Sequence, residues 1–305
     1  MENSMKTLLP AWEAWDHFST VECERVAEVI LNKVPPSFQY EQLTTFALGD
    51  QRHRILVFTW TPPASREEQG PLRFAFLPGG QATLGYDRTH PFIPTAAQAE
   101  SWQKETIERG YTNDSLDVFL DRILTPFRQV EIPPLLMQMS PSDGDAPPIL
   151  VNGRLTPQRS VSLQRVRETV LADGFRLPTS DEWEYACGAG TRALFRWGDI
   201  TPNHRPVRFR PFSQSWEEFL SGLPWRDYVQ PNAFGLQFSQ NGYQWEMCQE
   251  IDMMRAGDGG IATHLGAGIL AEWLPLATSF VTKLSDFELR RQMFSEGYFR
   301  RVYPL

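Results

Sequence analysis

The residue types best suited to chemistry are concentrated in one stretch of the chain, FRLPTSDEWEYACGAG at residues 175–190. This stretch combines carboxylates, aromatic side chains and a cysteine within one short predicted helix. Carboxylates can transfer protons, and a thiolate can act as a nucleophile or a metal ligand. The stretch is therefore either a catalytic apparatus or a set of contacts that holds the fold together. The spacing of its residues distinguishes the two.

The spacing favours the structural interpretation. Thr179 is followed three residues later by Glu182, which predicts a capping box at the start of a helix. In such a box the hydroxyl accepts from the third amide, and the carboxylate accepts from the cap amide. Trp183 and Cys187 are four residues apart and share one helix face, and the glycines that follow end the helix.

An ion pair completes this interpretation. We expect Arg176 and Glu184 to pair in a buried or half-buried position and to hold two segments in register. With this pair and the capping box, structural contacts account for Arg176, Glu182 and Glu184. The residues predicted to be structural are Arg176, Thr179, Glu182, Trp183, Glu184 and Trp245.

Elsewhere the chain offers little support for catalysis. No serine lies in a G-x-S-x-G elbow, which argues against acyl transfer. The glycine-rich stretch at 257–268 lacks the G-K-[ST] ending and the preceding strand of a phosphate loop. The best metal set is His264 with Glu272, Asp252 or Asp258, where glycines let the backbone approach a ligand closely. A lone histidine beside glycines is more often an ordinary loop residue.

Composition excludes several classes of protein. The 305 residues include 41% hydrophobic residues and carry a net charge of −8, so the chain is not disordered and is not expected to bind nucleic acid. No signal peptide and no apolar run of membrane-spanning length is visible. Three scattered cysteines, Cys23, Cys187 and Cys248, fit free thiols in a reducing compartment. We therefore expect a cytoplasmic protein that does not contact a membrane.

Turns and aromatic residues predict a loop-rich α+β fold. The chain has 24 prolines, 21 glycines and 10 tryptophans, and bulky aromatic side chains can fill the space that regular elements leave open. Hydrophobic periodicity and turn residues give the expected elements. These are helices at 11–34, at 160–174 and twice within 95–124, and strands at 54–60, 72–80 and 128–141.

Several motifs together resemble one known family. RLPTSDEWEYACGAGT resembles the R-L-P-T-x-x-E-W-E-Y-A motif of formylglycine-generating-enzyme (sulfatase-modifying factor) domains. The motifs LPGGQATLGYD, RQVEIPPLLMQ, LFRWGD, NAFGLQFSQNGYQWEMCQE and EGYFRRVYPL are similar to other motifs of that family, in the family's order. The resemblance covers about residues 72–305. It implies a variant C-type-lectin-like fold, with residues 1–71 as an N-terminal helix and strand extension and a helical insertion near 95–124.

Departures from the family pattern bear on activity. The family's copper enzymes have two nearby cysteines shortly before the final strand, whereas residues 249–305 contain none. Its iron-using sulfoxide synthases need an H-x-x-x-H-x-E motif, which this sequence lacks. The usual glycine-glycine-serine turn is replaced by LATSFVTK at 276–283. We therefore predict no catalytic residues.

Calcium is the cofactor that the resemblance suggests. The family binds calcium partly through the region that corresponds to 232–250, where Asn232 and Glu246 remain. The intervening segment is one residue longer here, and several oxygen-bearing side chains are replaced. Calcium needs 6–8 oxygen ligands, so the sequence retains only part of that site.

Three functions remain open. The first is a non-catalytic binding protein for a protein, a peptide or a small ligand, and the second is a subunit whose activity belongs to a partner chain. The third is a metal-dependent oxidoreductase of the same superfamily with a non-standard site. Composition and motifs favour binding.

The resemblance places the functional surface at about residues 198–230 and 253–295. Arginine and tryptophan are enriched at binding hot spots, and an arginine cluster can attract an anionic partner. Alternatively, these arginines pair with Glu217, Glu218 and Asp227 and tie down a loop, and the binding surface lies near 87–130. The candidate ligand-binding residues are Arg205, Arg208, Arg210, Trp216, Trp225, Arg226, His264 and Trp273.

Overall fold

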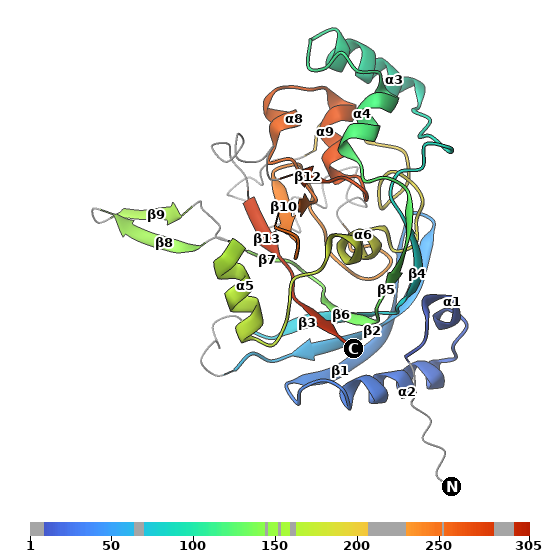
Figure 1. Cartoon of the computed structure of the whole chain (residues 1–305), viewed down its shortest axis with the longest axis vertical. Coiled ribbons are helices and arrows are strands. Elements are labelled where there is room, and N and C mark those ends of the chain that lie inside the picture. Colours follow the sequence, from blue (N-terminus) through green and yellow to red (C-terminus); the bar gives the residue numbers. More distant parts are fainter. Residues whose placement is uncertain are drawn as a thin grey trace.

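Two five-stranded sheets form the framework of the molecule (Figure 1). The computed structural model describes residues 9–63, 70–143, 146–151, 154–158, 163–206, 230–251, 253–283 and 296–305. Helices and strands occur together with many loops, so the predicted α+β class is confirmed. The helices are α1 (Trp12–Trp15), α2 (Thr20–Leu31), α3 (Ala96–Ser101), the π-helix η2 (Trp102–Ile107), α4 (Leu116–Ile123), α5 (Leu163–Ala172), α6 (Ser180–Gly188), α8 (Ile261–His264), α9 (Ile269–Trp273) and the 3₁₀ turn η4 (Leu274–Leu276).

The first sheet is antiparallel and has the order β1-β2-β3-β6-β14. Its strands are β1 (Phe38–Leu48), β2 (Gln51–Trp60), β3 (Leu72–Leu77), β6 (Leu135–Gln138) and β14 (Val302–Pro304). β1 pairs with β2, and β2 pairs with β3, so residues 38–60 share a sheet with the segment that carries the family motifs. The edge strand β1 was not predicted from the sequence.

The second sheet has the order β12-β11-β10-β13-β7. Its strands are β12 (Thr282–Lys283), β11 (Met253–Arg255), β10 (Gln244–Met247), β13 (Glu296–Phe299) and β7 (Ser142–Asp143). The β10–β13 pair is parallel and the other pairs are antiparallel. Two further two-stranded sheets pair β4 (Gly80–Leu84) with β5 (Arg128–Ile132) and β8 (Ala146–Val151) with β9 (Arg154–Gln158).

Other elements pack against both faces of the first sheet. Side chains alternate between the two faces along each strand. Leu56 and Phe58 of β2 lie in a core with α2, whereas Ile55 and Val57 lie in a second core with α6. All four side chains are fully buried. This placement explains why 54–60 reads as a nearly continuous apolar run. Figure 1 shows α6 between the two sheets and α2 on the outer face.

The predicted helix at 11–34 is wrong, because the structure has two helices there. α1 ends at Trp15, and α2 begins after Ser19. The Ser19 hydroxyl accepts from the Glu22 amide, and the Glu22 carboxylate accepts from the Ser19 amide. This second capping box starts a new helix inside the apolar pattern.

The helices predicted within 95–124 form a third core with the C-terminal helices. α3, η2 and α4 pack with α9, as Figure 1 shows at the top of the molecule. The predicted break at Gly110 is present, with φ of 78°. α4 is preceded by Ser115 and not by the predicted Asn113 or Asp114. This layer packs beside the loop at 191–199, which lines the site described below.

The capping box at α6 is confirmed, but the predicted partner of Arg176 is wrong. Arg176 pairs with Glu182 through two contacts of 2.6 Å. Glu184 instead accepts from Arg255 at 2.8 Å and from Arg128 at 2.9 Å. The capping carboxylate turns back toward the helix start, where Arg176 lies, whereas Glu184 faces the β4–β5 pair.

The end of α6 also differs from expectation. Ala189, and not a glycine, follows the helix in the left-handed conformation with φ of 48°. Its carbonyl oxygen lies 3.0 Å from Nε2 of the buried His53.

None of the helices in the described part of the chain is both long and apolar enough to cross a membrane.

Candidate functional site

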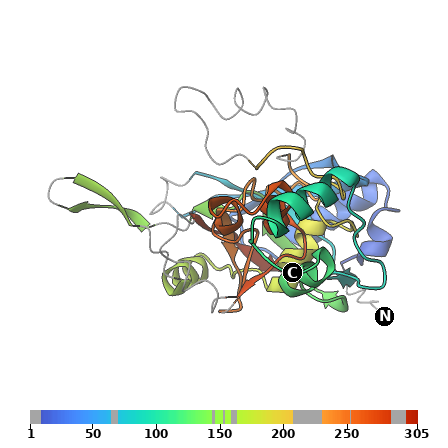
Figure 2. The same ribbon diagram turned by 90° about the horizontal axis from the view of Figure 1, so that it is seen from above.

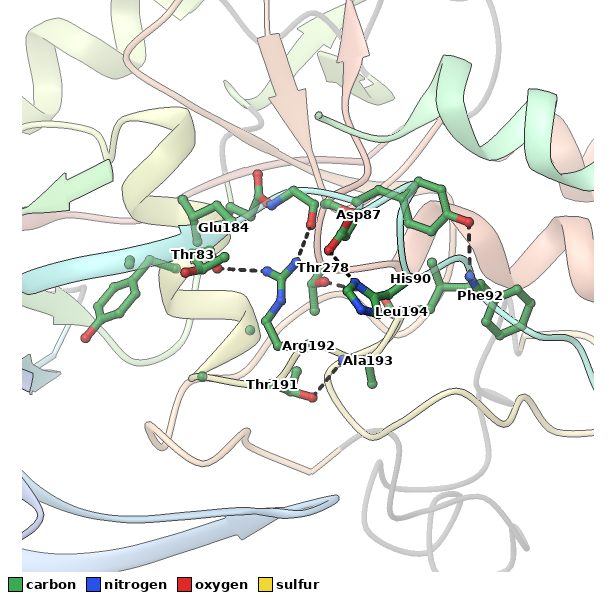
Figure 3. Close-up of a pocket in the computed structure, with 18 of the residues that line it drawn as sticks. Thr83, Asp87, His90, Phe92, Glu184, Thr191, Arg192, Ala193, Leu194 and Thr278 are labelled. Carbon is green, nitrogen blue, oxygen red and sulfur yellow. Dashed lines mark hydrogen bonds and ion pairs between the residues drawn. The ribbon is translucent and has the colours of Figure 1, made fainter. Parts of the chain in front are cut away.

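A cavity of about 600 Å³ opens between the loop after β4, the C-terminal end of α6 and the loop at 191–199 (Figure 3). Its size is in the range usual for ligand sites. Part of its wall comes from residues 85–93, at the start of the region predicted as an alternative binding surface. Asp199, Thr278 and Ser279 contribute another part of the wall and fall within the predicted surface.

Gly85 fixes the path of the loop after β4. Its φ is 84°, and a Cβ at this position would meet the Pro126 carbonyl oxygen at 2.0 Å. Only glycine fits such a close approach with a positive φ. The Gly85 amide donates to Glu184 Oε1 at 2.5 Å, so this loop is attached directly to α6.

Asp87, Thr89 and His90 form a compact polar turn in this loop. Asp87 Oδ1 accepts from the amide and the hydroxyl of Thr89. Asp87 Oδ2 lies 2.9 Å from Nδ1 of His90. The Thr89 hydroxyl, His90 and the Thr89 amide together hold the pKa of Asp87 well below its usual value. Asp87 is therefore ionised and orients an exposed imidazole at the cavity.

Arg192 reaches into the cavity from the opposite loop, as Figure 3 shows. Its Nη1 donates to the Thr83 carbonyl at 2.8 Å, and its Nη2 donates to the Gly85 carbonyl at 3.0 Å. Its guanidinium lies 5.6 Å from the ring centre of Phe127. No carboxylate of the described residues lies within ion-pair distance of it.

Glu184 is part of the cavity lining but is already committed to other contacts. Its carboxylate is buried and accepts from Gly85, Thr125, Arg128 and Arg255. A carboxylate that accepts hydrogen bonds from two guanidinium groups and two further donors has its acceptor sites occupied and is not available for proton transfer. Glu184 is therefore a structural residue, as predicted, with different partners.

Exposed apolar side chains line the cavity or adjoin residues that line it. Ile93 lines the cavity and is 83% exposed, and Phe127 beneath Arg192 is 48% exposed. Ile200 follows the lining residue Asp199 and is 64% exposed. Large apolar side chains gathered around a polar cavity are typical of a surface that contacts another molecule.

Three of the eight predicted ligand-binding residues lie in the described part of the chain, and none of these three lines the cavity. Arg205 pairs with Glu272, with 3.2 Å between Nη1 and Oε1. His264 is exposed at the end of α8, and Trp273 is 1% exposed and donates to the His204 carbonyl from the core. Five of the predicted residues lie outside the described residues: Arg208, Arg210, Trp216, Trp225 and Arg226.

Sequence reasoning missed the residues that dominate the cavity. Arg192 stands in an ordinary loop, TRALFRWGD, and only the fold brings it to Thr83 and Gly85, about a hundred residues earlier. His90 was not among the predicted site residues. The LGYD turn at 84–87 was recognised as a family motif, and that motif was the available signal for the site.

The cysteines do not fit the family's copper chemistry. Cys23, Cys187 and Cys248 are all buried. Burial raises the pKa of the Cys187 thiol to about 12 and also raises that of Cys248. A copper route needs thiolates that a substrate can reach. Within the described ranges, His, Cys, Asp and Glu side chains form no group of three or more that could hold a metal ion.

The two residues suggested for calcium are occupied by protein contacts. Asn232 Oδ1 accepts from the amides of Phe234 and Leu236. Glu246 accepts from Arg300 at 2.6 Å and 2.7 Å and from the Trp183 indole at 3.0 Å. Calcium at this pair would have to displace these donors, including a buried guanidinium.

Comparison with known proteins agrees with the motifs. Residues 74–283 match the family described as "Sulfatase-modifying factor enzyme 1-like domain". One curated relative, the "Formylglycine-generating enzyme" of Streptomyces coelicolor, is 36% identical over 85 residues. This match covers 25% of the present chain and 26% of the relative, so the chain matches only about a quarter of that enzyme's length.

Proposed function

Because this chain belongs to the sulfatase-modifying factor enzyme 1-like family, we propose that it uses the family fold as a non-catalytic binding protein, alone or as the subunit of a partner. The cavity at Arg192 and His90 takes the ligand, which is a peptide, a segment of a protein or a small molecule. One observation carries this proposal. Arg192, His90 and Ile93 line the cavity, whereas the thiols are buried and Glu184 is held by Arg128 and Arg255.

The composition of the cavity supports binding. A few fixed polar groups beside apolar side chains give orientation and affinity, as in most ligand sites. Arg192 supplies directed donors, Asp87 orients His90, and Ile93 offers apolar area. None of these contacts requires a covalent step.

The competing proposal is a metal-dependent oxidoreductase with a non-standard site. The name of the Streptomyces coelicolor relative describes an enzyme. The buried cysteines of the present chain argue against the same activity here. Elemental analysis of the purified protein tests the alternative. A transition metal at one equivalent, with oxygen consumption that depends on it, would replace the binding proposal.

A cavity-filling substitution tests the binding proposal. Ala193 lines the cavity and is half-buried, so Ala193→Phe should fill the cavity without disturbing a core. Ligands for the wild-type protein are selected from a phage-displayed peptide library and a fragment library. We expect Ala193→Phe to weaken the selected ligands at least about tenfold, which is about 1.4 kcal/mol.

Ala47→Phe is the matched control, because Ala47 is exposed on the edge strand β1, away from the cavity. Both variants are first checked for wild-type melting temperature. Ligands that bind both variants as tightly as the wild type would place the binding site elsewhere. Failure of both libraries to yield a ligand would count against the binding function.

A further inference from the structure

Arg192 is held in place by groups that do not neutralise its charge. Two of the five N–H groups of its guanidinium donate to backbone carbonyls. The other three have no acceptor among the described residues and can donate to a ligand. The ring of Phe127 restricts the guanidinium further. A cation fixed in this way has paid its ordering cost before a ligand arrives, which strengthens binding of an anion.

The other charged groups at the cavity are already engaged. Asp87 contacts Thr89 and His90, and Asp199 accepts from the Leu194 amide. Glu184 lies between Arg128 and Arg255. Among the described residues that line the cavity, Arg192 is thus the guanidinium group that a ligand can use.

The neighbouring carboxylates restrict the charge of the ligand. Asp87 is ionised, and both Asp87 and Asp199 line the same cavity. Repulsion by these groups is about twice as strong for a phosphate dianion as for a singly charged carboxylate. A planar carboxylate also matches the planar donor arrangement of arginine.

The apolar residues restrict the rest of the ligand. Ile93 is exposed and lines the cavity, and the exposed ring of Phe127 lies 5.6 Å from the Arg192 guanidinium. Apolar or aromatic groups gain most from covering such side chains.

We propose that the cavity recognises a carboxylate joined to an apolar or aromatic group, with Arg192 as the residue that contacts the carboxylate. This inference rests on the proposed binding function and adds the chemical class of the ligand. Chain ends of peptides and acidic small molecules both offer this chemistry.

The test uses phenylacetate with two matched probes, phenylacetamide and benzyl phosphate, each titrated by protein-observed NMR. We expect phenylacetate to bind at least about tenfold more tightly than the neutral amide, because only the acid can accept charge-assisted hydrogen bonds from Arg192 with an ionised group. Arg192→Gln should remove this preference, and Arg192→Lys should retain part of it. Arg88→Gln is the control, because Arg88 lies on the loop after β4 and pairs with Asp121.

Each outcome bears on one proposal. Equal binding of acid and amide, or an unchanged preference in folded Arg192→Gln, would overturn the carboxylate assignment. Tighter binding of benzyl phosphate than of phenylacetate would overturn the choice of a carboxylate over a phosphate. If phenylacetate fails to bind but Ala193→Phe abolishes the selected ligands, the binding function stands and this inference fails. Chemical shift changes that phenylacetate causes only at residues 83–93 and 191–199 would support both the binding function of the cavity and the carboxylate assignment.

Discussion

At the residue scale, the acids that looked reactive in the sequence are held by buried arginines. Glu184 pairs with Arg255, and Glu246 pairs with Arg300; both arginines are 0% exposed. Burying a charge is costly unless it is paired and hydrogen-bonded. Each of these carboxylates also accepts further hydrogen bonds. Their positions are therefore explained by the fold without any catalytic role.

Glu272 is the exception among the buried acids. It is 0% exposed on α9, and neither of its oxygens accepts a hydrogen bond from the described residues. Burial raises its pKa to about 7, against the opposing effect of Arg205. Glu105 and Asp258 raise the pKa further. This carboxyl changes charge near neutral pH in a position where the charge is costly.

The pH dependence of stability should report on Glu272. In the unfolded chain its pKa is near 4.5, so between about pH 4.5 and 7 the folded state holds the extra proton. Its contribution to stability is present below pH 4.5 and is lost as the pH rises through about 7. The loss proceeds at up to about 1.4 kcal/mol per pH unit. Glu272→Gln should remove this part of the slope.

Urea denaturation at several pH values measures the effect. Glu108→Gln is the control, because Glu108 is exposed just after η2 and is not among the groups that raise the pKa of Glu272. A Glu272→Gln variant with the same pH slope as the wild type would contradict the assignment.

At the element scale, capping boxes set the start of three helices. Ser19, Thr95 and Thr179 each accept from the third helical amide, and the residue at that position returns the contact. The Thr179 box is reinforced, because Glu182 also pairs with Arg176. Ser19 is exposed, whereas Thr179 is half-buried.

The two caps should therefore differ in strength. Loss of a cap hydroxyl costs about 0.5–2 kcal/mol. We expect Thr179→Ala near the upper end of this range and Ser19→Ala near the lower end, measured by urea denaturation. A larger loss of stability in Ser19→Ala than in Thr179→Ala would show that tertiary contacts add nothing to the Thr179 cap.

Elements with strong local signals were predictable, and elements defined by tertiary contacts were not. The Thr179 box, the buried strand 54–60 and the break at Gly110 were read correctly. β1 was missed because it is an edge strand with irregular alternation and a bulge near Tyr40. The partner of Glu184 was missed because Arg255 lies about seventy residues away in sequence. The lining of the cavity also comes from segments far apart in sequence, and only some of its residues fall within the ranges predicted for a functional surface.

At the scale of the whole molecule, the last ten residues complete both sheets. β13 joins the second sheet beside β10, and β14 joins the first sheet beside β6. Between them Arg300 pairs with Glu246, and Arg301 pairs with Asp173 at 3.0 Å. Val302 also bridges to Arg176 through two backbone hydrogen bonds.

Removal of this segment should prevent folding. A chain that ends at residue 295 leaves Glu246 and Asp173 buried without their guanidinium partners, and breaking a buried pair costs about 3–5 kcal/mol. Two such losses are comparable to the usual stability of a domain. We expect the truncated chain to lose its near-ultraviolet circular dichroism and its cooperative urea transition. A cooperative transition at the wild-type midpoint would contradict this expectation.

The position of residues 296–305 has a consequence for synthesis in the cell. A ribosome delivers the chain from its N-terminus, so β13 and β14 are missing from both sheets until residues 296–305 have emerged. Until then β6 and β10 each have one unpaired edge, and unpaired strand edges invite aggregation. A stop codon introduced before residue 296 should therefore be as damaging as one near the middle of these 305 residues.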